Sequence, residues 1–181
     1  MDVWRINLAE KSLQVEAVPG GWEKLGGRGL TARILLDEVR ATCYPLGSEN
    51  KLIFAPGLLS GHHLSSCDRL SVGSKSPLTG GIKEANAGGT TAIDLTRLGI
   101  KVLILENKLS NGLWVLHLSM EGARFDSADD LIGVGAYEST RLLLDRYGSR
   151  VSIALIGPSG ELKLNSAGIL NLDKDRVPSR I

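Results

Sequence analysis

Two stretches of this chain carry the same ordered pattern of residues, one near the start and one in the second half. Trp114 follows Trp4 by 110 positions, and the sequence RLLLD that begins at Arg141 follows RILLD at Arg33 by 108 positions. The spacing between matched residues is therefore nearly the same in both stretches. Such a pattern predicts one structural unit that occurs twice, and this restricts the fold more than any single motif does.

Each stretch has the pattern of two strands, a glycine-rich segment and an amphipathic helix. A buried strand that ends in Pro and Gly follows each helix, KLIFAPG in the first half and VSIALIGP in the second. More alternating segments come next, RLSVGSKS and LKLNSAGI. We therefore expect an α+β fold of duplicated β-β-α-β-β units with pseudo-twofold symmetry. The halves would be residues 1–80 and 111–181 of a single domain, and their two sheets would share one core.

The segment from Asn86 to Glu106 has no counterpart in the second half. Thr90 or Thr91 is suited to cap a short helix through AIDLTRL, and Gly99 is suited to close that helix in the left-handed conformation. The sequence KVLILE that follows has the pattern of a buried strand.

Composition excludes several classes of partner and location. The net charge of +1 on 181 residues is too small to indicate a nucleic-acid or membrane surface. No apolar run approaches the roughly 20 residues that span a bilayer, and the start lacks the apolar core of a signal peptide. We expect a cytoplasmic protein that binds neither nucleic acid nor membrane. Cys43 and Cys67 are the two cysteines, and in a reducing compartment they are expected as free thiols.

The sequence GRGLTA, residues 27–32, fits the dinucleotide fingerprint Gly-x-Gly-x-x-Gly/Ala at the start of a helix. The preceding GWEKLG is not a buried strand, and no parallel strand with a terminal acid follows at the right distance. Glycines that let the helix pack closely are therefore favoured over a nicotinamide or flavin site.

A metal site is conceivable at His62 and His63, with His117 and Cys67 as further ligands. Adjacent imidazoles rarely reach the same ion, and no helical i, i+4 spacing accompanies them. Solvated histidines are the favoured interpretation.

The most informative stretch is RLSVGSKSPLTGGIKEANAGGTT, residues 69–91. Gly88 and Gly89 precede the expected helix, so free N–H groups and the positive end of its dipole would meet there. Arg69 adds donors that match phosphate, and Asn86 offers an oxygen that suits Mg²⁺. These residues predict a pocket for a phosphorylated cofactor; a glycine-rich turn with a solvated Arg is the alternative. The chain shows no nucleophile motif, and we assign no catalytic residue.

Several motifs taken together resemble a known family: GGRGLTARILLDE, PLGSENKLIFAPGLLSG, DRLSVGSKSPLTG, ANAGG and IGPSGE. The chain is similar, over essentially its whole length, to the N-terminal domain of the tungsten-containing aldehyde ferredoxin oxidoreductases. The resemblance implies two related halves whose sheets form the base for a bis-pyranopterin tungsten cofactor, with molybdenum in some relatives.

The resemblance also implies roles for individual residues. Arg69 matches an Arg between a pterin and the iron–sulfur cluster, Asn86 matches a ligand of the Mg²⁺ that joins the two pterin phosphates, and Gly88 matches a backbone contact to the cofactor. Near the end of the chain, Arg180 matches an Arg that touches the second pterin. Ile181 matches the residue whose carbonyl binds the Mg²⁺.

Members of this family continue into helical domains that carry the four cysteines of a [4Fe–4S] cluster and the acid and His proposed at the substrate. The resemblance therefore implies a chain truncated at its C-terminus, or one subunit of a split enzyme, that does not catalyse alone. The complete enzyme would oxidise an aldehyde or oxo compound and pass electrons to a ferredoxin-type acceptor. Its partners would be the missing helical domains or a partner subunit, with a homodimer as one option. The competing interpretation is a stand-alone domain that binds a pterin cofactor or another protein.

Overall fold

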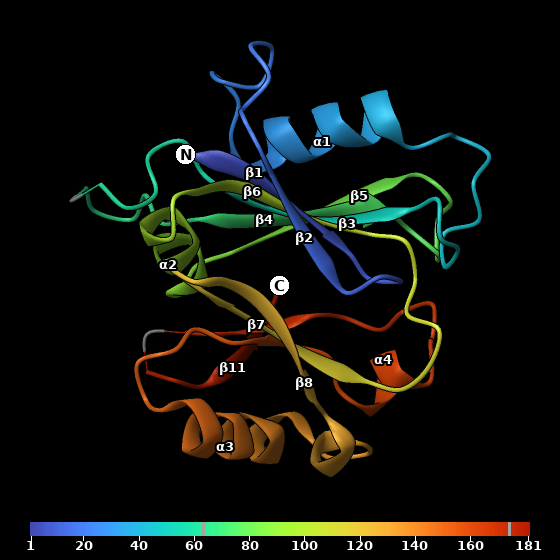
Figure 1. Ribbon diagram of the computed structural model, residues 1–181, viewed down its shortest axis with the longest axis vertical. Coiled ribbons are helices and arrows are strands. Elements are labelled where there is room, and N and C mark those ends of the chain that lie inside the picture. The colour runs from blue at the N-terminus through green and yellow to red at the C-terminus, as the bar shows by residue number, and fades with distance from the viewer. Residues whose placement is uncertain (63, 174) are drawn as a thin grey trace.

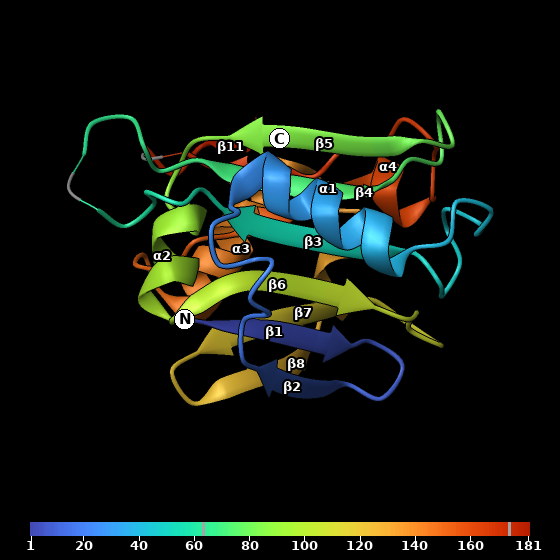
Figure 2. The same ribbon diagram turned by 90° about the horizontal axis from the view of Figure 1, so that it is seen from above.

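The computed structural model describes residues 1–62, 64–173 and 175–181, and it arranges them in four layers: a helix, a sheet, a second β layer and a second helix (Figure 1). The upper β layer is a six-stranded sheet. Its strands are β1 (Asp2–Asn7), β2 (Ser12–Glu16), β3 (Lys51–Pro56), β4 (Leu70–Lys75), β5 (Ile82–Ala87) and β6 (Ile100–Glu106). They lie in the order β2-β1-β6-β3-β4-β5, which Figure 2 shows from above. β6 is parallel to β1 and antiparallel to β3.

Side chains alternate between the two faces of this sheet, as the period of a β-strand requires. Val102 and Ile104 of β6 belong to the core beneath helix α1 (Gly27–Glu38). Leu103, between them, belongs to the core on the opposite face. Both faces of the sheet are therefore apolar and must be covered.

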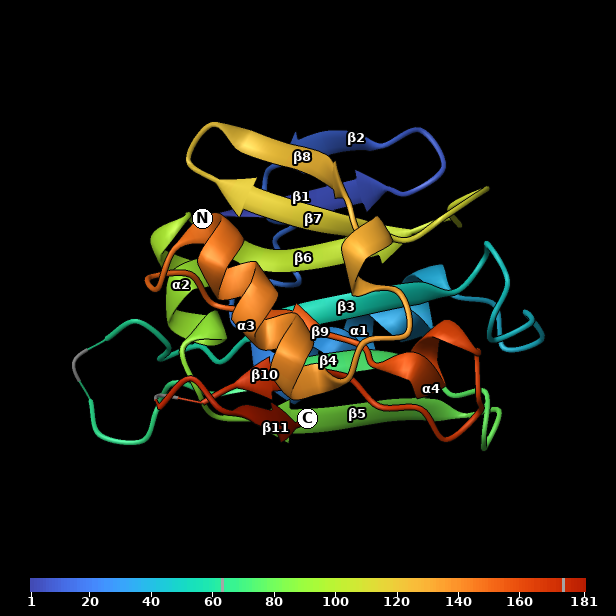
Figure 3. The same cartoon turned by 90° about the horizontal axis from the view of Figure 1, so that it is seen from below.

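The second half of the chain covers the lower face (Figure 3). Its strands are β7 (Trp114–Ser119), β8 (Gly122–Ser127), β9 (Ala154–Leu155), β10 (Leu170–Leu172) and β11 (Pro178–Arg180). Its helices are a short 3₁₀ helix (Asp129–Leu131), α3 (Ala136–Tyr147) and α4 (Pro158–Glu161). β7 and β8 form a hairpin, and β9, β10 and β11 form a three-stranded sheet in the order β11-β10-β9.

One core lies between the two β layers. Its buried members include Trp4, Phe54 and Leu103 from the upper sheet. Leu118 and Phe125 from the β7–β8 hairpin pack against them and are partly buried. The expected α+β fold and the shared core are both present.

The connection between the halves also follows the sequence prediction. Helix α2 (Thr91–Arg97) is followed by Gly99, which has φ +76°, and then by the buried strand β6. No helix in the described part of the chain combines the length and apolarity needed to cross a membrane.

Two strands expected in the second half differ from the structure: one is shorter, and the other is absent from the described residues. The segment VSIALIGP contributes only Ala154–Leu155, because Pro158 begins helix α4 immediately afterwards. The alternating segment LKLNSAGI forms a turn instead of a strand, and the strand β10 begins after it. Leu162 and Leu164 are 72% and 52% exposed, so their alternation with polar residues did not reflect a buried face.

Charged side chains lie together where the C-terminal end of α1 meets the sheet. Arg5 donates from Nε to Glu16, 2.8 Å away, and from both terminal nitrogens to Glu38, at 2.7 and 2.9 Å. Lys51 lies 3.2 Å from Glu38 and also pairs with Glu106. Burial on its own would raise the pKa of Glu38, but the hydrogen bonds and charge of Arg5, with a smaller contribution from Lys51, lower it overall. Because its pKa is lower in the folded state, ionised Glu38 stabilises the folded protein.

We expect Glu38→Gln to reduce the free energy of unfolding by about 1–2 kcal/mol at pH 7, because the bonds from Arg5 lose their charged acceptor. The folded pKa of Glu38 is below its usual value of 4.5, so its contribution is complete above that pH and is lost as the pH falls. The difference between the wild type and the variant should therefore shrink towards pH 3. Chemical denaturation at a series of pH values measures it.

The matched control for this experiment is Asp37→Asn on the exposed side of the same helix. Asp37 pairs with Arg33 at i, i+4 on the surface, so its loss should change the free energy of unfolding by less than about 0.5 kcal/mol. A difference between wild type and Glu38→Gln that stays constant from pH 7 to pH 3 would contradict the assignment.

Candidate functional site

The stretch at residues 69–91 folds into the hairpin of β4 and β5 and the loop that follows it. Ser76 organises the turn: its hydroxyl oxygen accepts from the N–H groups of Leu78 and Thr79, both at 3.2 Å. Its own N–H donates to the carbonyl of Gly81 at 2.8 Å, and Gly80 has φ +73°. The turn fixes the register of the two strands.

This register places the predicted site residues together. Leu70 lies opposite Ala87 and Ser71 lies opposite Asn86. Continuing the register by one residue brings Arg69 opposite Gly88. A local hairpin is therefore sufficient to bring together residues that are 17 to 19 positions apart in the chain.

Arg69 and Asn86 are both exposed and are bonded to each other. Arg69 Nε donates to Asn86 Oδ1 at 2.6 Å, and one terminal nitrogen donates to the Asn86 carbonyl at 3.3 Å. Asn86 Nδ2 donates to the hydroxyl of Ser71 at 3.1 Å. These bonds fix the orientation of the amide, with its oxygen on the side of the guanidinium. The other terminal nitrogen of Arg69, Nη1, has no hydrogen-bond partner within the described residues.

Gly88 leaves space beside the guanidinium of Arg69. A Cβ atom at this position would lie 3.3 Å from Arg69 Nη1. The absence of a side chain therefore keeps this nitrogen and the backbone of the loop accessible to the same ligand atom. Such an arrangement suits a phosphate oxygen.

The N-terminus of α1 lies beside this group. A Cβ on Gly27 would be 3.3 Å from the hydroxyl of Ser71, the residue that bonds Asn86. Figure 2 shows the left-hand end of α1, where the helix starts, close to the arrowhead of β5. Helix α1 has no acidic residue in its first turn and no side-chain cap, so the positive end of its dipole adds to the charge of Arg69.

The predicted cap of α2 is right in position but not in its hydrogen bond. Thr90 is the N-cap residue of α2, but no side-chain cap hydrogen bond is present. Its hydroxyl lies 2.5 Å from that of Ser152, which in turn donates to Asp94 at 2.5 Å. The hydroxyl of Thr91 donates to Asn171. Both threonines therefore bond across to the second half of the chain.

Asn171, on β10, is a site residue that the sequence analysis missed. It is fully buried, and its Nδ2 donates to the carbonyl of Gly88 at 2.7 Å. The visible signal was a single polar residue between two leucines in LNL. A polar residue inside a short apolar strand usually has a specific hydrogen-bond partner.

The predicted residues at the end of the chain lie on and after β11. The backbone of Arg180 pairs with Leu170 of β10; the prediction for the Arg180 side chain lies outside the part of the chain that the structure describes. The N–H of Ile181 donates to the carbonyl of Ile169 at 3.0 Å, and its side chain packs against the core between the two β layers.

The chain end lies on the same side of the molecule as the Arg69 group. Ile181 packs against the core cluster that contains Leu70, the first residue of β4. In Figures 2 and 3 the end marked C lies at the arrowhead of β5, the strand that carries Asn86.

The two other candidate sites in the sequence are the glycine-rich motif GRGLTA and the histidine pair. A Cβ on Gly26, directly before this motif, would lie 2.7 Å from the backbone nitrogen of Leu58, whereas a Cβ on Gly27 or Gly29 would meet side-chain atoms at 3.3 and 3.8 Å. The closest packing therefore falls one residue before the motif. His63 lies outside the described residues. His62 is exposed, whereas His117 stacks on Tyr147 with ring centroids 5.1 Å apart. Within the described residues, no group of three or more His, Cys, Asp or Glu side chains could hold a metal.

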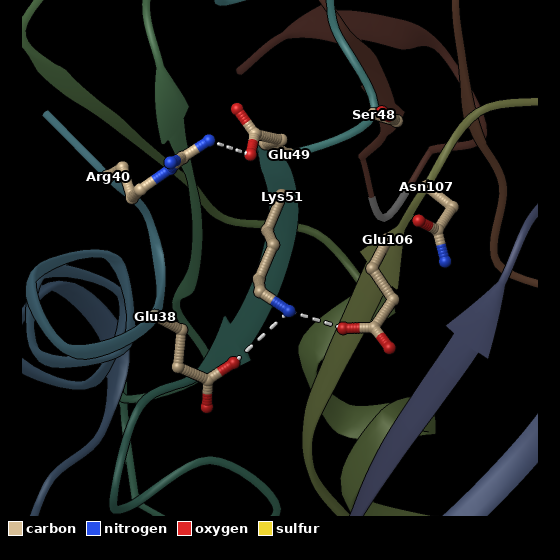
Figure 4. A pocket seen from close by; sticks show the side chains of 7 residues that line it. All are labelled: Glu38, Arg40, Ser48, Glu49, Lys51, Glu106 and Asn107. Carbon is tan, nitrogen blue, oxygen red and sulfur yellow. Dashed lines mark hydrogen bonds and ion pairs between the residues drawn. The ribbon is translucent and has the colours of Figure 1, made fainter. Parts of the chain in front are cut away.

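A pocket of about 360 Å³ lies at the opposite end of the sheet from Arg69 (Figure 4). It is lined by the ion pairs described above, and Figure 4 shows Lys51 between Glu38 and Glu106. The same pocket includes the pair of Arg40 with Glu49. These charges are paired with one another, so the pocket is an ion-pair network that joins α1 to the sheet and not a candidate binding site.

Comparison with known proteins identifies the family. Residues 3–181 match the family model described as aldehyde ferredoxin oxidoreductase, N-terminal domain, and the chain belongs to this family. It is 35% identical over 179 residues to the tungsten-containing aldehyde ferredoxin oxidoreductase of Pyrococcus furiosus, covering 97% of this chain and 29% of that protein. It is 34% identical over 172 residues to the enzyme of the same name from Pyrococcus horikoshii, covering 93% of this chain and 28% of that protein.

A solved structure shows the same fold. The active site complex BamBC of benzoyl coenzyme A reductase, in complex with 1,5-dienoyl-CoA, has a chain that matches with a TM-score of 0.89 and 31% identity. The match covers 94% of this chain and 26% of that one. The chain thus spans less than a third of the length of each of these proteins. The resemblance seen in the sequence motifs is confirmed at the level of the family and the fold.

The two neighbouring glycines of the loop should respond differently to substitution by Ala. A Cβ on Gly89 would lie 2.3 Å from the Leu172 carbonyl oxygen, and Gly89 has φ +97°. Gly89→Ala should therefore destabilise the fold by about 2–4 kcal/mol, because neither the backbone contact nor the conformation can adjust. At Gly88 the contact is the end of a flexible Arg side chain, so Gly88→Ala should cost less than about 1 kcal/mol. Thermal denaturation of the two variants measures the difference, and equal losses would contradict this account of the loop.

Proposed function

We propose that this chain binds the phosphate end of a bis-pyranopterin cofactor of tungsten or molybdenum, as the N-terminal domain of an aldehyde ferredoxin oxidoreductase-type enzyme. Membership of the family supports the proposal, as do relatives whose names include tungsten. The observation in the structure that carries it is the meeting of Arg69, Asn86 and Gly88 at one exposed end of the β4–β5 hairpin.

The residues present fit a phosphorylated group. Arg69 holds its guanidinium against Asn86 with Nε and one terminal nitrogen, which leaves Nη1 directed to the space that a side chain on Gly88 would fill. A planar guanidinium fixed in this way loses little further freedom when it binds an anion. In this proposal Arg69 binds a pterin on the side of the iron–sulfur cluster, and the backbone of Gly88 contacts the cofactor.

The proposed Mg²⁺ ligands also have suitable chemistry. Asn86 Oδ1 accepts one hydrogen bond from Arg69 and, as a carbonyl oxygen, has a second lone pair. Amide and backbone carbonyl oxygens are ligands that Mg²⁺ accepts. We assign Asn86 Oδ1 and the Ile181 carbonyl to the ion that joins the two pterin phosphates, and Arg180 to the second pterin.

When bound, the cofactor would supply the two-electron redox chemistry that converts an aldehyde or oxo group to the acid. The residues of this chain would hold and orient it. The acceptor path would need a [4Fe–4S] cluster, which requires four cysteine ligands, and this chain has only Cys43 and Cys67. Further domains or a partner subunit would therefore provide the cluster, the substrate-binding groups and the contact with a ferredoxin-type acceptor. We expect no turnover by this chain alone.

We also propose that residues 1–80 and 111–181 derive from one duplicated unit related by a pseudo-twofold axis. Both halves follow the order of a β-hairpin, a helix and further strands. These strands are β3 and β4 in the first half, with β5 directly after it, and β9, β10 and β11 in the second half, where the 3₁₀ helix and α4 are additions. In this arrangement β11 would be the counterpart of β5. The pairing of β11 with β10 resembles that of β5 with β4, since both are antiparallel.

The test is the metal content of the protein expressed together with the parts that complete the enzyme. The double variant Arg69→Ala with Asn86→Ala should contain at least tenfold less tungsten or molybdenum than the wild type, because both the phosphate donor and an Mg²⁺ ligand are lost. Inductively coupled plasma mass spectrometry and pterin fluorescence measure the content.

The matched control is Arg141→Ala, which removes an exposed Arg from α3 whose ion pairs among the described residues are with Glu138 and Asp145 of the same helix. It should keep the metal content of the wild type. An unchanged metal and pterin content in the double variant would show that the site assignment is wrong.

A further inference from the structure

Asn171 connects the Gly88 loop to the second β layer. Its side chain is fully buried, its Nδ2 donates to the Gly88 carbonyl at 2.7 Å, and its Oδ1 accepts from the hydroxyl of Thr91. Gly88 and Thr91 lie at the two ends of the loop between β5 and α2. One amide therefore holds both ends of the loop that follows Asn86.

The backbone of the same residue holds the strand at the chain end. Asn171 lies opposite Ser179 in the β10–β11 ladder, and the hydroxyl of Ser179 donates to the Asn171 carbonyl at 3.2 Å. Ser179 directly precedes Arg180 and Ile181 in the sequence. Asn171 thus contacts both groups of proposed ligands. Its side chain contacts the loop that follows Asn86, and its backbone contacts β11, the strand that carries Arg180.

The contact is also close. A Cβ on Gly89 would lie 2.7 Å from Asn171 Nδ2 and 2.3 Å from the carbonyl oxygen of the next residue, Leu172. At Gly89 the loop therefore packs directly against the backbone of β10, beside the amide of Asn171. At this distance the position of one segment sets the position of the other.

A buried Asn whose amide is fully hydrogen-bonded can stabilise a fold without any role at a binding site. What distinguishes Asn171 is the identity of its partners among the described residues: its side chain bonds Gly88 and Thr91, two and five residues after Asn86, and its carbonyl oxygen accepts from Ser179 of β11. Thr91, the more distant of the two side-chain partners from Asn86, is held through the same amide as Gly88.

We propose that Asn171 is a positioning residue that sets the spacing between the two halves of the cofactor site, the Asn86–Gly88 group and the Arg180–Ile181 group. This inference rests on the proposed function, because a bis-pterin ligand bridged by one ion requires its two phosphate-binding groups at a fixed separation. Asn171 acts through the backbone of the loop and of β11 and touches no ligand itself.

The first experiment uses the chain itself and measures amide hydrogen exchange in the wild type, Asn171→Asp and Thr91→Val. Asn171→Asp keeps the acceptor for Thr91 but loses the donor to the Gly88 carbonyl, and Thr91→Val removes the other bond of the amide. Each variant should raise exchange rates roughly tenfold in both residues 86–91 and residues 176–181. Leu35→Ala, in the core between α1 and the opposite face of the six-stranded sheet, is the control for a general loss of stability and should not raise these two segments selectively.

An increase confined to residues 86–91, or no selective increase in either segment, would overturn the proposed coupling. Thr91→Val keeps Asn171 in place, so it provides a result even where Asn171→Asp does not fold.

The second experiment measures tungsten and molybdenum in the completed enzyme carrying the same substitutions. Asn171→Asp should lower the metal content about tenfold at a temperature where circular dichroism shows it folded, and Leu35→Ala should not. A wild-type protein without either metal would refute the proposed function, whereas a metal-loaded wild type with an equally loaded Asn171→Asp would refute the positioning role alone.

Discussion

The central strand β6 contributes side chains to two apolar cores at once. Val102 and Ile104 pack under α1, whereas Leu103 packs towards the second half of the chain. Because a sheet with two apolar faces cannot leave either face in water, one helix is needed on one side and a second layer on the other. The burial of both faces of this sheet therefore determines the position of every other element.

The candidate site depends on this arrangement because it lies at the edge of the junction between the layers. The β4–β5 hairpin brings Arg69 and Asn86 together by its own register and needs no contact with the second half to do so. The loop after the hairpin does need that contact, because Asn171 and Ser152 bond it from the other layer. The hairpin supplies the ligands, and the docking of the two layers fixes the direction of the backbone that leaves it.

Local features of this fold could be predicted from the sequence, and features that join distant segments could not. The short continuous apolar run in KVLILE identified β6 as a buried strand, and the hairpin residues brought Arg69 close to Asn86 because they are separated by a single turn. Asn171 lies 83 positions from Gly88, and its role depends on how the layers meet, which no local pattern contains. The alternation at Leu162 misled the assignment of a strand, because alternating leucines in a turn expose their side chains.

In the candidate site, the residues that would contact a ligand are exposed, and the residues that hold them in place are buried. Arg69 and Asn86 are exposed, whereas Ser71 and Asn171, which bond Asn86 and the Gly88 carbonyl, are both fully buried. A buried hydrogen-bonding group is costly to displace, because its partner would be left without a bond in an apolar environment. Buried groups therefore hold Asn86 and the Gly88 carbonyl, and Asn86 in turn holds Arg69. This pre-organisation would lower the entropy lost when a large ligand binds. An exposed Arg in an ordinary glycine-rich turn would lack such supports, and their presence is the structural reason to regard this stretch as a binding site.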